Sequence, residues 1–317
     1  MEFGHISKLG KNCKITLYNT KAIKYNAVIK NTPRKKPVEE RMVIFMKKLL
    51  AMMMVLAMLL CVCGCSEAEQ TDQGTPAVDT DTQSDLAYIQ NNGKIIVGIT
   101  DYAPMDYKDE NGEWIGFDAE FARLFAQELG VEIEFFVIGD WSKKFVELET
   151  KNIDVIWNGM TISEDVLNNT SCSNPYVYNA QVVVTKSDVA ANYATAESLQ
   201  DLSIACELGS VAEDALADIG ITDYITVENQ EAALLEVKAG TSQACVVDVT
   251  LARAMTGEGT NYSDLSQAQT LTEEEYGVGF RKGSDVTEQF NAFMAKLMND
   301  GTLDALAEKY GLTLVKE

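Results

Sequence analysis

The sequence predicts an α/β fold with mainly parallel sheets, arranged as two similar lobes. Short apolar runs alternate with amphipathic helical patterns through most of residues 86–317, as they do where helices cover parallel strands. The alternation occurs in two series, which indicates two lobes. The chain has 317 residues, of which 46% are hydrophobic and 23% charged, and this composition is typical of one or two globular domains.

The first series begins with a strand at residues 94–100 and a hairpin. Apolar residues on either side of Asp109-Glu110-Asn111-Gly112 indicate a hairpin turn. The turn shares a fragment with calcium-binding loops, but Tyr107 stands where another oxygen ligand is needed, so we expect no metal there. We then expect a helix capped by Asp118 and ending at Gly130, a strand at 132–137, a helix at 142–151 and a strand at 154–157.

The second series follows an apolar strand at residues 180–185, which leaves the first lobe. Its expected elements are a strand at 203–207, a helix from Ser210, a strand near Ile225, a helix at 229–239 and a strand at 244–248. A strand at 277–280 then precedes helices at 286–299 and 303–310, which the stop signal Asn299-Asp300-Gly301 separates.

Charge and histidine content exclude several functions. Residues 1–50 hold 12 Lys and Arg against 3 Asp and Glu, whereas residues 66–317 hold 14 against 45, a net charge of −31. A body this acidic repels phosphate backbones, so we expect no nucleic-acid partner. The only histidine is His5, which removes Ser-His-Asp triads, Cys-His dyads and HExxH zinc sites from the folded part. The body also has no phosphate-cradling glycine motif, and we expect no cofactor and no metal.

An export signal is expected at residues 46–64. Met46-Lys47-Lys48 precedes the uncharged stretch 49–62, which is shorter than the roughly 20 apolar residues of a membrane span. Val62-Cys63-Gly64-Cys65 resembles a bacterial lipobox, so we expect Cys65 to be lipidated and to become the mature N-terminus. An uncleaved membrane anchor is the alternative.

The segments on either side of this signal carry little sign of a fold. Residues 1–45 are interpreted as an upstream extension that the mature protein lacks. Residues 65–85 are expected to be the lipidated cysteine and a flexible tether, because residues 66–85 hold six acids and no aromatic residue. The body contains Cys172, Cys206 and Cys245, which we expect to be free buried thiols, with a Cys206–Cys245 bridge as the alternative.

Candidate binding residues recur at the ends of predicted strands, where open α/β sheets place their ligands. Tyr102 and Trp141 lie beside charged residues, so an exposed aromatic sandwich is favoured over core positions. Thr161 follows Gly159 closely enough to offer a hydroxyl and an amide, and otherwise is a turn residue. Ser210 is either a helix cap or a ligand contact. Asp248 is either the N-cap of a helix beginning at Val249 or the partner of a ligand ammonium.

These residues resemble the bacterial extracytoplasmic solute-binding proteins of family 3, which serve polar amino-acid ABC transporters. The resemblance runs from about Gly93 to Leu312. It rests on Gly116-Phe117-Asp118, Asn158-Gly159-Met160-Thr161-Ile162, Asn174-Pro175-Tyr176, Gly209-Ser210, Glu275-Tyr276-Gly277 and Asn299-Asp300-Gly301-Thr302-Leu303.

The resemblance implies a periplasmic-binding-protein-like fold of type II, in which two hinge strands cross between the lobes. The crossings are expected at residues 179–185 and 276–280. Lobe 1 then comprises residues 86–182 and 277–317, and lobe 2 comprises residues 183–276. The implied function is the substrate-binding lipoprotein of an ABC importer. Its partners are an amino acid, a permease and a separate ATPase; a lipid anchor is the only membrane contact, and the protein is a monomer.

The resemblance also assigns roles to residues. Tyr102 and Trp141 sandwich the ligand side chain, the Gly159 carbonyl and Thr161 bind the amino-acid backbone, and Asp248 binds the ammonium. This favours the binding role of Asp248 over the capping role.

The sequence departs from the family at three positions. Val166 stands where the family usually has an arginine that grips the ligand carboxylate. Glu207 stands where a neutral or basic residue is common, and Val211 where a hydroxyl is common. The helix start at Gly209–Ala212 could hold a carboxylate instead. Alternatively Asp101, Glu207 and Asp248 neutralise a cationic amino acid or amine.

Two other functions remain open. A small-molecule dehydratase of this fold would need a general acid, for which Glu207 is the candidate. A ligand-sensing receptor subunit would need a signalling partner that this chain does not encode.

Overall fold

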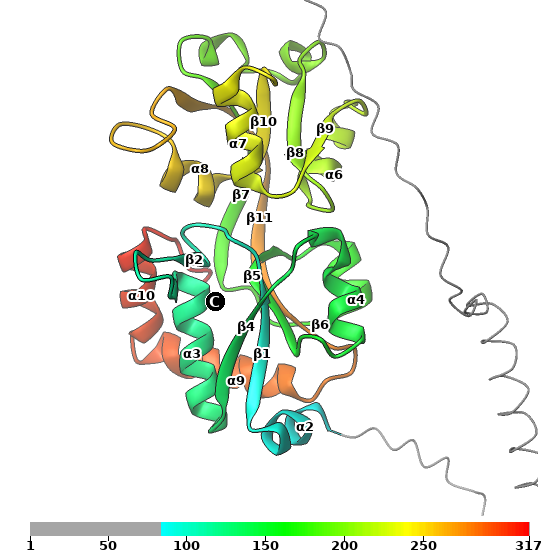
Figure 1. Cartoon of the computed structure of the whole chain (residues 1–317), viewed down its shortest axis with the longest axis vertical. Helices are drawn as coiled ribbons and strands as arrows, with labels where there is room; N and C mark the ends of the chain where they lie inside the picture. The colour runs from blue at the N-terminus through cyan, green and yellow to red at the C-terminus, as the bar shows by residue number, and fades with distance from the viewer. Residues whose placement is uncertain (1–83, 317) are drawn as a thin grey trace, which may run out of the picture. The chain divides into compact units, whose positions relative to one another are not determined.

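The computed structural model describes residues 84–316, which form a mixed sheet with helices packed around it (Figure 1). The described strands pair in the order β4-β1-β5-β11-β7-β10-β8-β9, with β6 also paired to β11. The strands of this sheet are β1 (Lys94–Ile99), β4 (Glu132–Val137), β5 (Val155–Thr161), β6 (Ser171–Cys172), β7 (Val177–Lys186), β8 (Ile204–Glu207), β9 (Ile225–Val227), β10 (Ala244–Asp248) and β11 (Leu265–Phe280). A separate hairpin joins β2 (Tyr107–Lys108) to β3 (Trp114–Ile115).

The helices lie where most of the amphipathic patterns predicted them. They are α2 (Asp85–Asn92), α3 (Phe117–Leu129), α4 (Lys144–Glu149), α5 (Glu164–Asn169), α6 (Ala212–Asp218), α7 (Gln230–Ala239), α8 (Val249–Met255), α9 (Val286–Asn299) and α10 (Thr302–Tyr310). The helix expected at 142–151 is shorter, because Trp141–Lys143 form a 3₁₀ turn before it. The helix expected from Ser210 begins two residues later, at Ala212.

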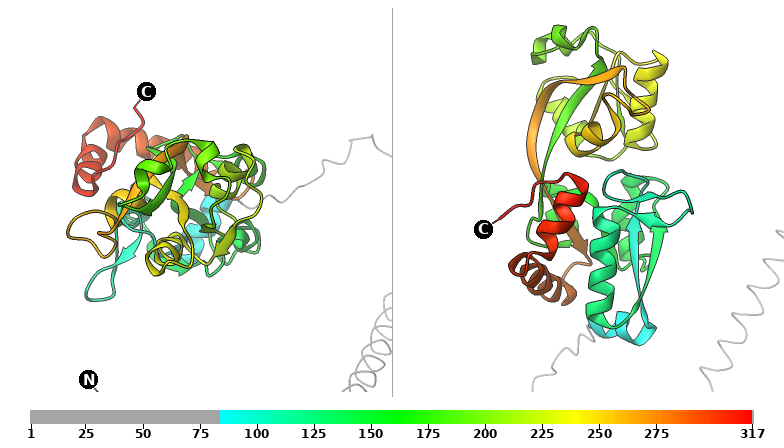
Figure 2. Two further views of the ribbon diagram at one scale, coloured as in Figure 1. Left: turned by 90° about the horizontal axis from the view of Figure 1, so that it is seen from above. Right: turned by 90° about the vertical axis from the view of Figure 1, so that its left-hand side faces the viewer.

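The sheet has two parallel ends and an antiparallel middle. Strand β1 pairs in parallel with β4 and β5 in lobe 1, and β8 pairs in parallel with β9 and β10 in lobe 2. Between them, β7 and β11 run antiparallel to each other and join the two lobes (Figures 1 and 2). This is the type II fold, with two strands crossing from lobe to lobe. The residue boundaries given above for the lobes stay a prediction.

Strand β11 is much longer than the expected strand at 277–280. It begins at Leu265 and stays paired with β7 from Leu265 opposite Lys186 to Tyr276 opposite Val177. Its first residues are mostly half-exposed and rich in Gln, Thr and Glu, so they lack the apolar run that marks a strand in a sequence. The two connections are therefore a continuous ribbon rather than short crossings.

Aromatic packing forms the centre of lobe 1. The ring of Trp157 on β5 meets Phe121 of α3 and Phe290 of α9 edge-on, with both centroid distances at 4.9 Å. Phe125 meets Phe290 edge-on at 5.2 Å. Such pairs add about 0.5–1.5 kcal/mol each beyond the area they bury. They attach α9 to the same side of lobe 1 as α3.

Asp118 has a different role from the helix cap that was expected. Helix α3 begins at Phe117 with Gly116 at its N-cap, and Asp118 is buried. Its carboxylate accepts hydrogen bonds from the Gly159 amide at 2.6 Å and from the Tyr176 hydroxyl at 2.9 Å. Because the helix starts two residues earlier than an Asp118 cap would require, Asp118 lies within its first turn and its side chain is buried. Asp118 therefore fixes the backbone at the end of β5, which borders the site.

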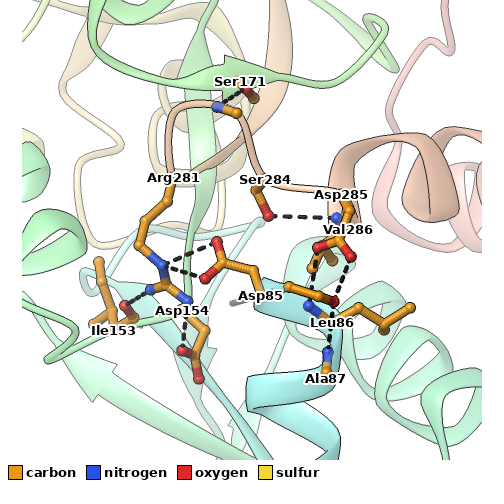
Figure 3. Close-up of polar contacts among 12 residues, drawn as sticks. Asp85, Leu86, Ala87, Ile153, Asp154, Ser171, Arg281, Ser284, Asp285 and Val286 are labelled. Atoms are coloured by element: carbon orange, nitrogen blue, oxygen red, sulfur yellow. Dashed lines mark hydrogen bonds and ion pairs between the residues drawn. The ribbon is translucent and has the colours of Figure 1, made fainter. Parts of the chain in front are cut away.

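Helix α2 was not predicted, and an arginine far away in sequence holds it in place (Figure 3). Arg281 lies between two carboxylates: its Nε donates to Asp85 at 3.0 Å and its Nη2 to Asp154 at 3.1 Å. Ser84 caps the helix by accepting from the Ala87 amide at 3.0 Å. The sequence analysis ended the tether at residue 85 and assigned no element to residues 86–92. Partners of the helix start such as Asp285 and Arg281 lie some 200 residues away in the chain.

The remaining predictions have mixed outcomes. Cys172, Cys206 and Cys245 are free, as expected, although Cys172 is half-exposed rather than buried. Among residues 84–316, the helices are all too short or too polar to cross a membrane. The upstream extension, the signal peptide, Cys65 and most of the tether lie outside the described residues.

Candidate functional site

A cavity of about 70 Å³ lies between the lobes, and its wall contains residues from both. Lobe 1 contributes the ends of β5 and the starts of α4 and α5; lobe 2 contributes the ends of β8 and β10 and the residues before α6. Seven of the nine predicted site residues line it: Trp141, Gly159, Thr161, Glu207, Ser210, Val211 and Asp248. Asp101 and Tyr102 are not among the lining residues.

The expected exposed aromatic sandwich is wrong. Trp141 is 8% exposed and lines the cavity, whereas Tyr102 is 3% exposed and lies behind Gly159. The Tyr102 hydroxyl is hydrogen-bonded to Thr250 of α8 at 2.6 Å and to Tyr276 of β11 at 2.5 Å. The charged neighbours of Tyr102 suggested exposure, but the ring packs against Gly159 and its hydroxyl is bonded to the other lobe.

Gly159 is required by its surroundings. Its φ is +56°, and an added Cβ would lie 2.6 Å from the Tyr102 ring and 3.1 Å from the Tyr276 ring. Only glycine adopts this conformation readily and allows such a close approach. Two residues later, Thr161 donates its hydroxyl hydrogen to Glu274 on β11 at 2.7 Å. Thr161 therefore connects the cavity wall to the hinge ribbon.

The Asp248 side chain is held by side-chain amides. The residue is the N-cap of α8, which begins at Val249 as the capping alternative expected, but its carboxylate makes no cap hydrogen bond. Its carboxylate accepts from Asn179 at 2.6 Å, from Gln181 at 2.5 Å and from Gln230. Burial raises the pKa of Asp248, while these hydrogen bonds oppose the rise.

The hinge ribbon supplies a second carboxylate to the same amides. Glu274 accepts from Asn179 at 2.5 Å and from Gln181 at 2.8 Å. Burial, together with Asp248, raises the pKa of Glu274 to about 7. Asn179, Gln181, Gln230 and Glu274 were not predicted from the sequence. Asn179 and Gln181 lie two residues apart on one face of β7, and this spacing is the signal that could have placed both amides at one site.

Glu207 presents a buried carboxyl to the cavity. It is 5% exposed at the end of β8, and its Oε1 has no hydrogen-bond partner among the described residues. Burial raises the pKa of Glu207 to about 8, with Asp248 adding to the rise and Lys144 opposing it. A buried carboxyl without a partner is costly unless it is protonated or meets a cation.

Among the described residues, Lys144 is the one cation that lines the cavity, and it was not predicted from the sequence. It is 7% exposed, and its ammonium donates to the Gly209 carbonyl at 3.0 Å and to the Trp141 carbonyl at 3.5 Å. Burial lowers its pKa, although nearby carboxylates oppose the effect. Because Gly209 belongs to the other lobe, Lys144 bridges the cleft.

Most amide groups at the start of α6 already have partners. Gly209 N donates to Glu213 at 2.8 Å, Ser210 N to the Glu207 carbonyl at 3.3 Å, and Ala212 N to the Ser210 hydroxyl at 3.3 Å. The Val211 amide donates to no acceptor among the described residues. Val166, at the position of the family's arginine, is buried against the same cavity. Lys144 and the amide of Val211 are therefore the groups left to meet a ligand carboxylate, since both residues line the cavity.

The cavity is acidic. Its lining holds four carboxyl groups, Asp165, Glu207, Asp214 and Asp248, against one ammonium. Within residues 84–316, acidic, cysteine and histidine side chains nowhere gather in a group of three that could hold a metal ion. The arrangement is therefore suited to binding a small molecule with excess positive charge.

Comparison with known proteins gives a consistent result. The sequence profile described as "Bacterial extracellular solute-binding proteins, family 3" matches residues 95–313. The L-cystine-binding protein TcyJ of Escherichia coli (strain K12) is 28% identical over 228 residues, which cover 71% of this chain and 85% of that protein.

Two solved structures share the fold at higher identity. An ancestral arginine-binding protein bound to arginine has a TM-score of 0.63 and 30% identity, covering 69% of this chain and 98% of its own. The ancestral amino acid-binding protein AncCDT-1, a precursor of cyclohexadienyl dehydratase, has a TM-score of 0.65 and 31% identity, covering 72% of this chain and 99% of its own.

Proposed function

Since this chain belongs to the bacterial extracellular solute-binding proteins of family 3, we propose that it captures a polar or cationic amino acid between its lobes and delivers it to an ABC permease. The observation that carries the proposal is the acidic cavity lined by both lobes. The arginine ligand of a relative of the same fold supports a cationic amino acid.

Opposite charges in the cavity supply the main polar contacts. Asp248 binds the ligand ammonium, and the three amides around it keep its carboxylate oriented. Lys144 binds the ligand carboxylate in place of the arginine that Val166 replaces, and Trp141, which also lines the cavity, packs against the rest of the ligand. Micromolar binding requires about 8 kcal/mol, and each charge-assisted hydrogen bond contributes about 1.5–3 kcal/mol. Apolar contact with Trp141 and the exclusion of water must supply the remainder.

Lobe closure is the proposed conformational step. Lys144 reaches Gly209, and Tyr102 reaches Thr250, only when the two lobes are together. A ligand that contacts Asp248 in one lobe and Thr161 in the other favours the closed form by its differential affinity. The ribbon of β7 and β11 is the natural hinge, because it is the covalent connection between the lobes.

Lipid anchoring at Cys65 completes the proposal for the cell. The signal-like residues 46–64 and the acidic residues 66–85 support a protein that is tethered outside the cell membrane. The permease and its ATPase would be separate chains, and the binding protein would act as a monomer.

Calorimetry against the twenty amino acids and the common polyamines tests the proposal. We expect micromolar or tighter binding of at least one polar or cationic amino acid, and at least tenfold weaker binding by Asp248→Asn, because one ion pair is lost. Tight binding of glutamate or aspartate in preference to basic ligands would contradict the acidic-cavity argument.

A dehydratase is the second candidate, because a general acid needs a raised pKa and a place facing the substrate. Glu207 has both properties, and one relative is named as a precursor of such an enzyme. Incubation with prephenate or arogenate, followed by product chromatography, tests this candidate. Turnover that Glu207→Gln removes would establish it, and no turnover at micromolar enzyme would exclude these two substrates.

A further inference from the structure

Glu207 and Asp248 line the same cavity, but their surroundings differ. Asp248 is surrounded by three amide donors, which satisfy most of its oxygen lone pairs. The Glu207 carboxyl accepts no hydrogen bond from any residue in the described part of the chain, and its Oε1 is buried. Buried polar atoms are nearly always hydrogen-bonded in folded proteins, so an exception at a cavity wall points to a missing ligand group.

We propose that Glu207 binds a second positive charge on the ligand, so that the cleft selects dibasic amino acids, such as those with a guanidinium or a second ammonium, over neutral ones. This inference rests on the proposed function and adds the ligand class to it. The ligand ammonium goes to Asp248, and the distal cation goes to Glu207.

Lys144 is not the hydrogen-bond partner that the Glu207 carboxyl lacks. Its ammonium donates to the Gly209 and Trp141 carbonyls, and it forms no ion pair within 4.0 Å among the described residues. Lys144 therefore reduces the negative potential near Glu207 but leaves the Glu207 carboxyl without an ion-pair partner among the described residues. The other charged groups that line the cavity are Asp165, Asp214 and Asp248, and all of them attract a cation.

The charge balance favours a ligand with a net positive charge. Four carboxyl groups against one ammonium give the lining a net charge of −3 when all are ionised. A neutral zwitterion leaves that charge unchanged, whereas a dibasic amino acid reduces it. In a water-excluded site, such a difference is worth more than on the surface.

Proton linkage gives the inference a second signature. Burial raises the pKa of Glu207 to about 8, so the carboxyl is mostly protonated at neutral pH before a cation arrives. A guanidinium requires the ionised form. Affinity for a dibasic ligand, measured relative to its neutral isostere, therefore rises with pH up to about 8 and falls by up to about tenfold for each pH unit below it. The titration of Asp248 and Glu274 affects the binding of both ligands, so it cancels in the ratio of their affinities.

The test compares L-arginine with L-citrulline, its neutral isostere, by calorimetry on the full chain. We expect wild type to prefer arginine by at least about tenfold, and Glu207→Gln to weaken arginine binding by about 10- to 100-fold. Citrulline binding by Glu207→Gln should change by less than about threefold, since its distal group is uncharged. The control is Glu228→Gln, which removes the same charge from an exposed position of lobe 2 that does not line the cavity; it should leave both affinities unchanged.

The outcomes separate this inference from the proposed function. If wild type binds both ligands equally, or if Glu207→Gln keeps the preference for arginine, Glu207 does not bind the second positive charge of the ligand. The chain would still bind amino acids. If wild type binds no amino acid or polyamine at all, the proposed function itself is wrong. The pH dependence of the arginine-to-citrulline ratio in wild type checks the inference without any variant, and a flat ratio between pH 6 and pH 8 overturns it.

Discussion

Replacing Lys144 tests whether a lysine has taken over the grip on the ligand carboxylate. Two of the three ammonium hydrogens of Lys144 point to the carbonyls of Gly209 and Trp141, which leaves one for a ligand. One charge-assisted hydrogen bond contributes about 1.5–3 kcal/mol, which corresponds to a loss of about 10- to 150-fold in affinity. We therefore expect Lys144→Met to bind L-arginine that much more weakly than wild type.

Agmatine separates this role from general damage to the cleft, because it has the guanidinium of arginine but no carboxylate. Lys144→Met should bind agmatine at least as well as wild type does, since a competing cation has been removed. The matched control is Lys143→Met, because Lys143 is adjacent, exposed and paired with Asp140 on the surface. Calorimetry measures the affinities of L-arginine and agmatine for both variants and for wild type. If Lys144→Met weakens arginine and agmatine equally, or weakens neither, the carboxylate is bound elsewhere.

Two further predictions concern stability and use urea unfolding. Gly159→Ala should cost about 2–5 kcal/mol, because strain at a positive φ adds to a Cβ only 2.6 Å from Tyr102. Its control is Gly93→Ala, which has φ +67° but open space around it and should cost only about 1–2 kcal/mol; equal losses would show that the close approach does not matter. Arg281→Met should cost about 3–5 kcal/mol, because it leaves the buried Asp154 carboxylate unpaired. A loss below about 1 kcal/mol would mean that the pair is not important for stability.

Local patterns in the sequence were sufficient for most of the strands and helices. The strands Glu132–Val137 and Ala244–Asp248 and the helix Val286–Asn299 have the predicted bounds, because apolar periodicity and turn residues define them on their own. The first half of β11 was missed because its partner, β7, rather than its own apolar residues, holds it in the sheet.

The candidate site could be predicted only in part. The residues at strand ends were found because parallel strands present their carboxyl ends at one edge, so Gly159, Glu207 and Asp248 line the same cavity. Lys144 and Gln230 were missed, since neither lies at a strand end. The exposure of Tyr102 and Trp141 was predicted wrongly, because contacts distant in sequence bury both: Trp141 packs among apolar side chains of lobe 1, and the Tyr102 hydroxyl is bonded to Thr250.

The sequence by itself determined the α/β class, the acidic character of the body and the absence of histidine chemistry from it, because these depend on composition and on periods of a few residues. Only the tertiary structure decided which charged groups have partners. Asp248 meets Gln181 from 67 positions away, Arg281 meets Asp85 from 196 positions away, and Oε1 of Glu207 meets no donor within residues 84–316. The physical reason is that a residue's backbone preference acts locally, whereas the field and hydrogen bonds at a buried side chain come from segments that only folding brings together.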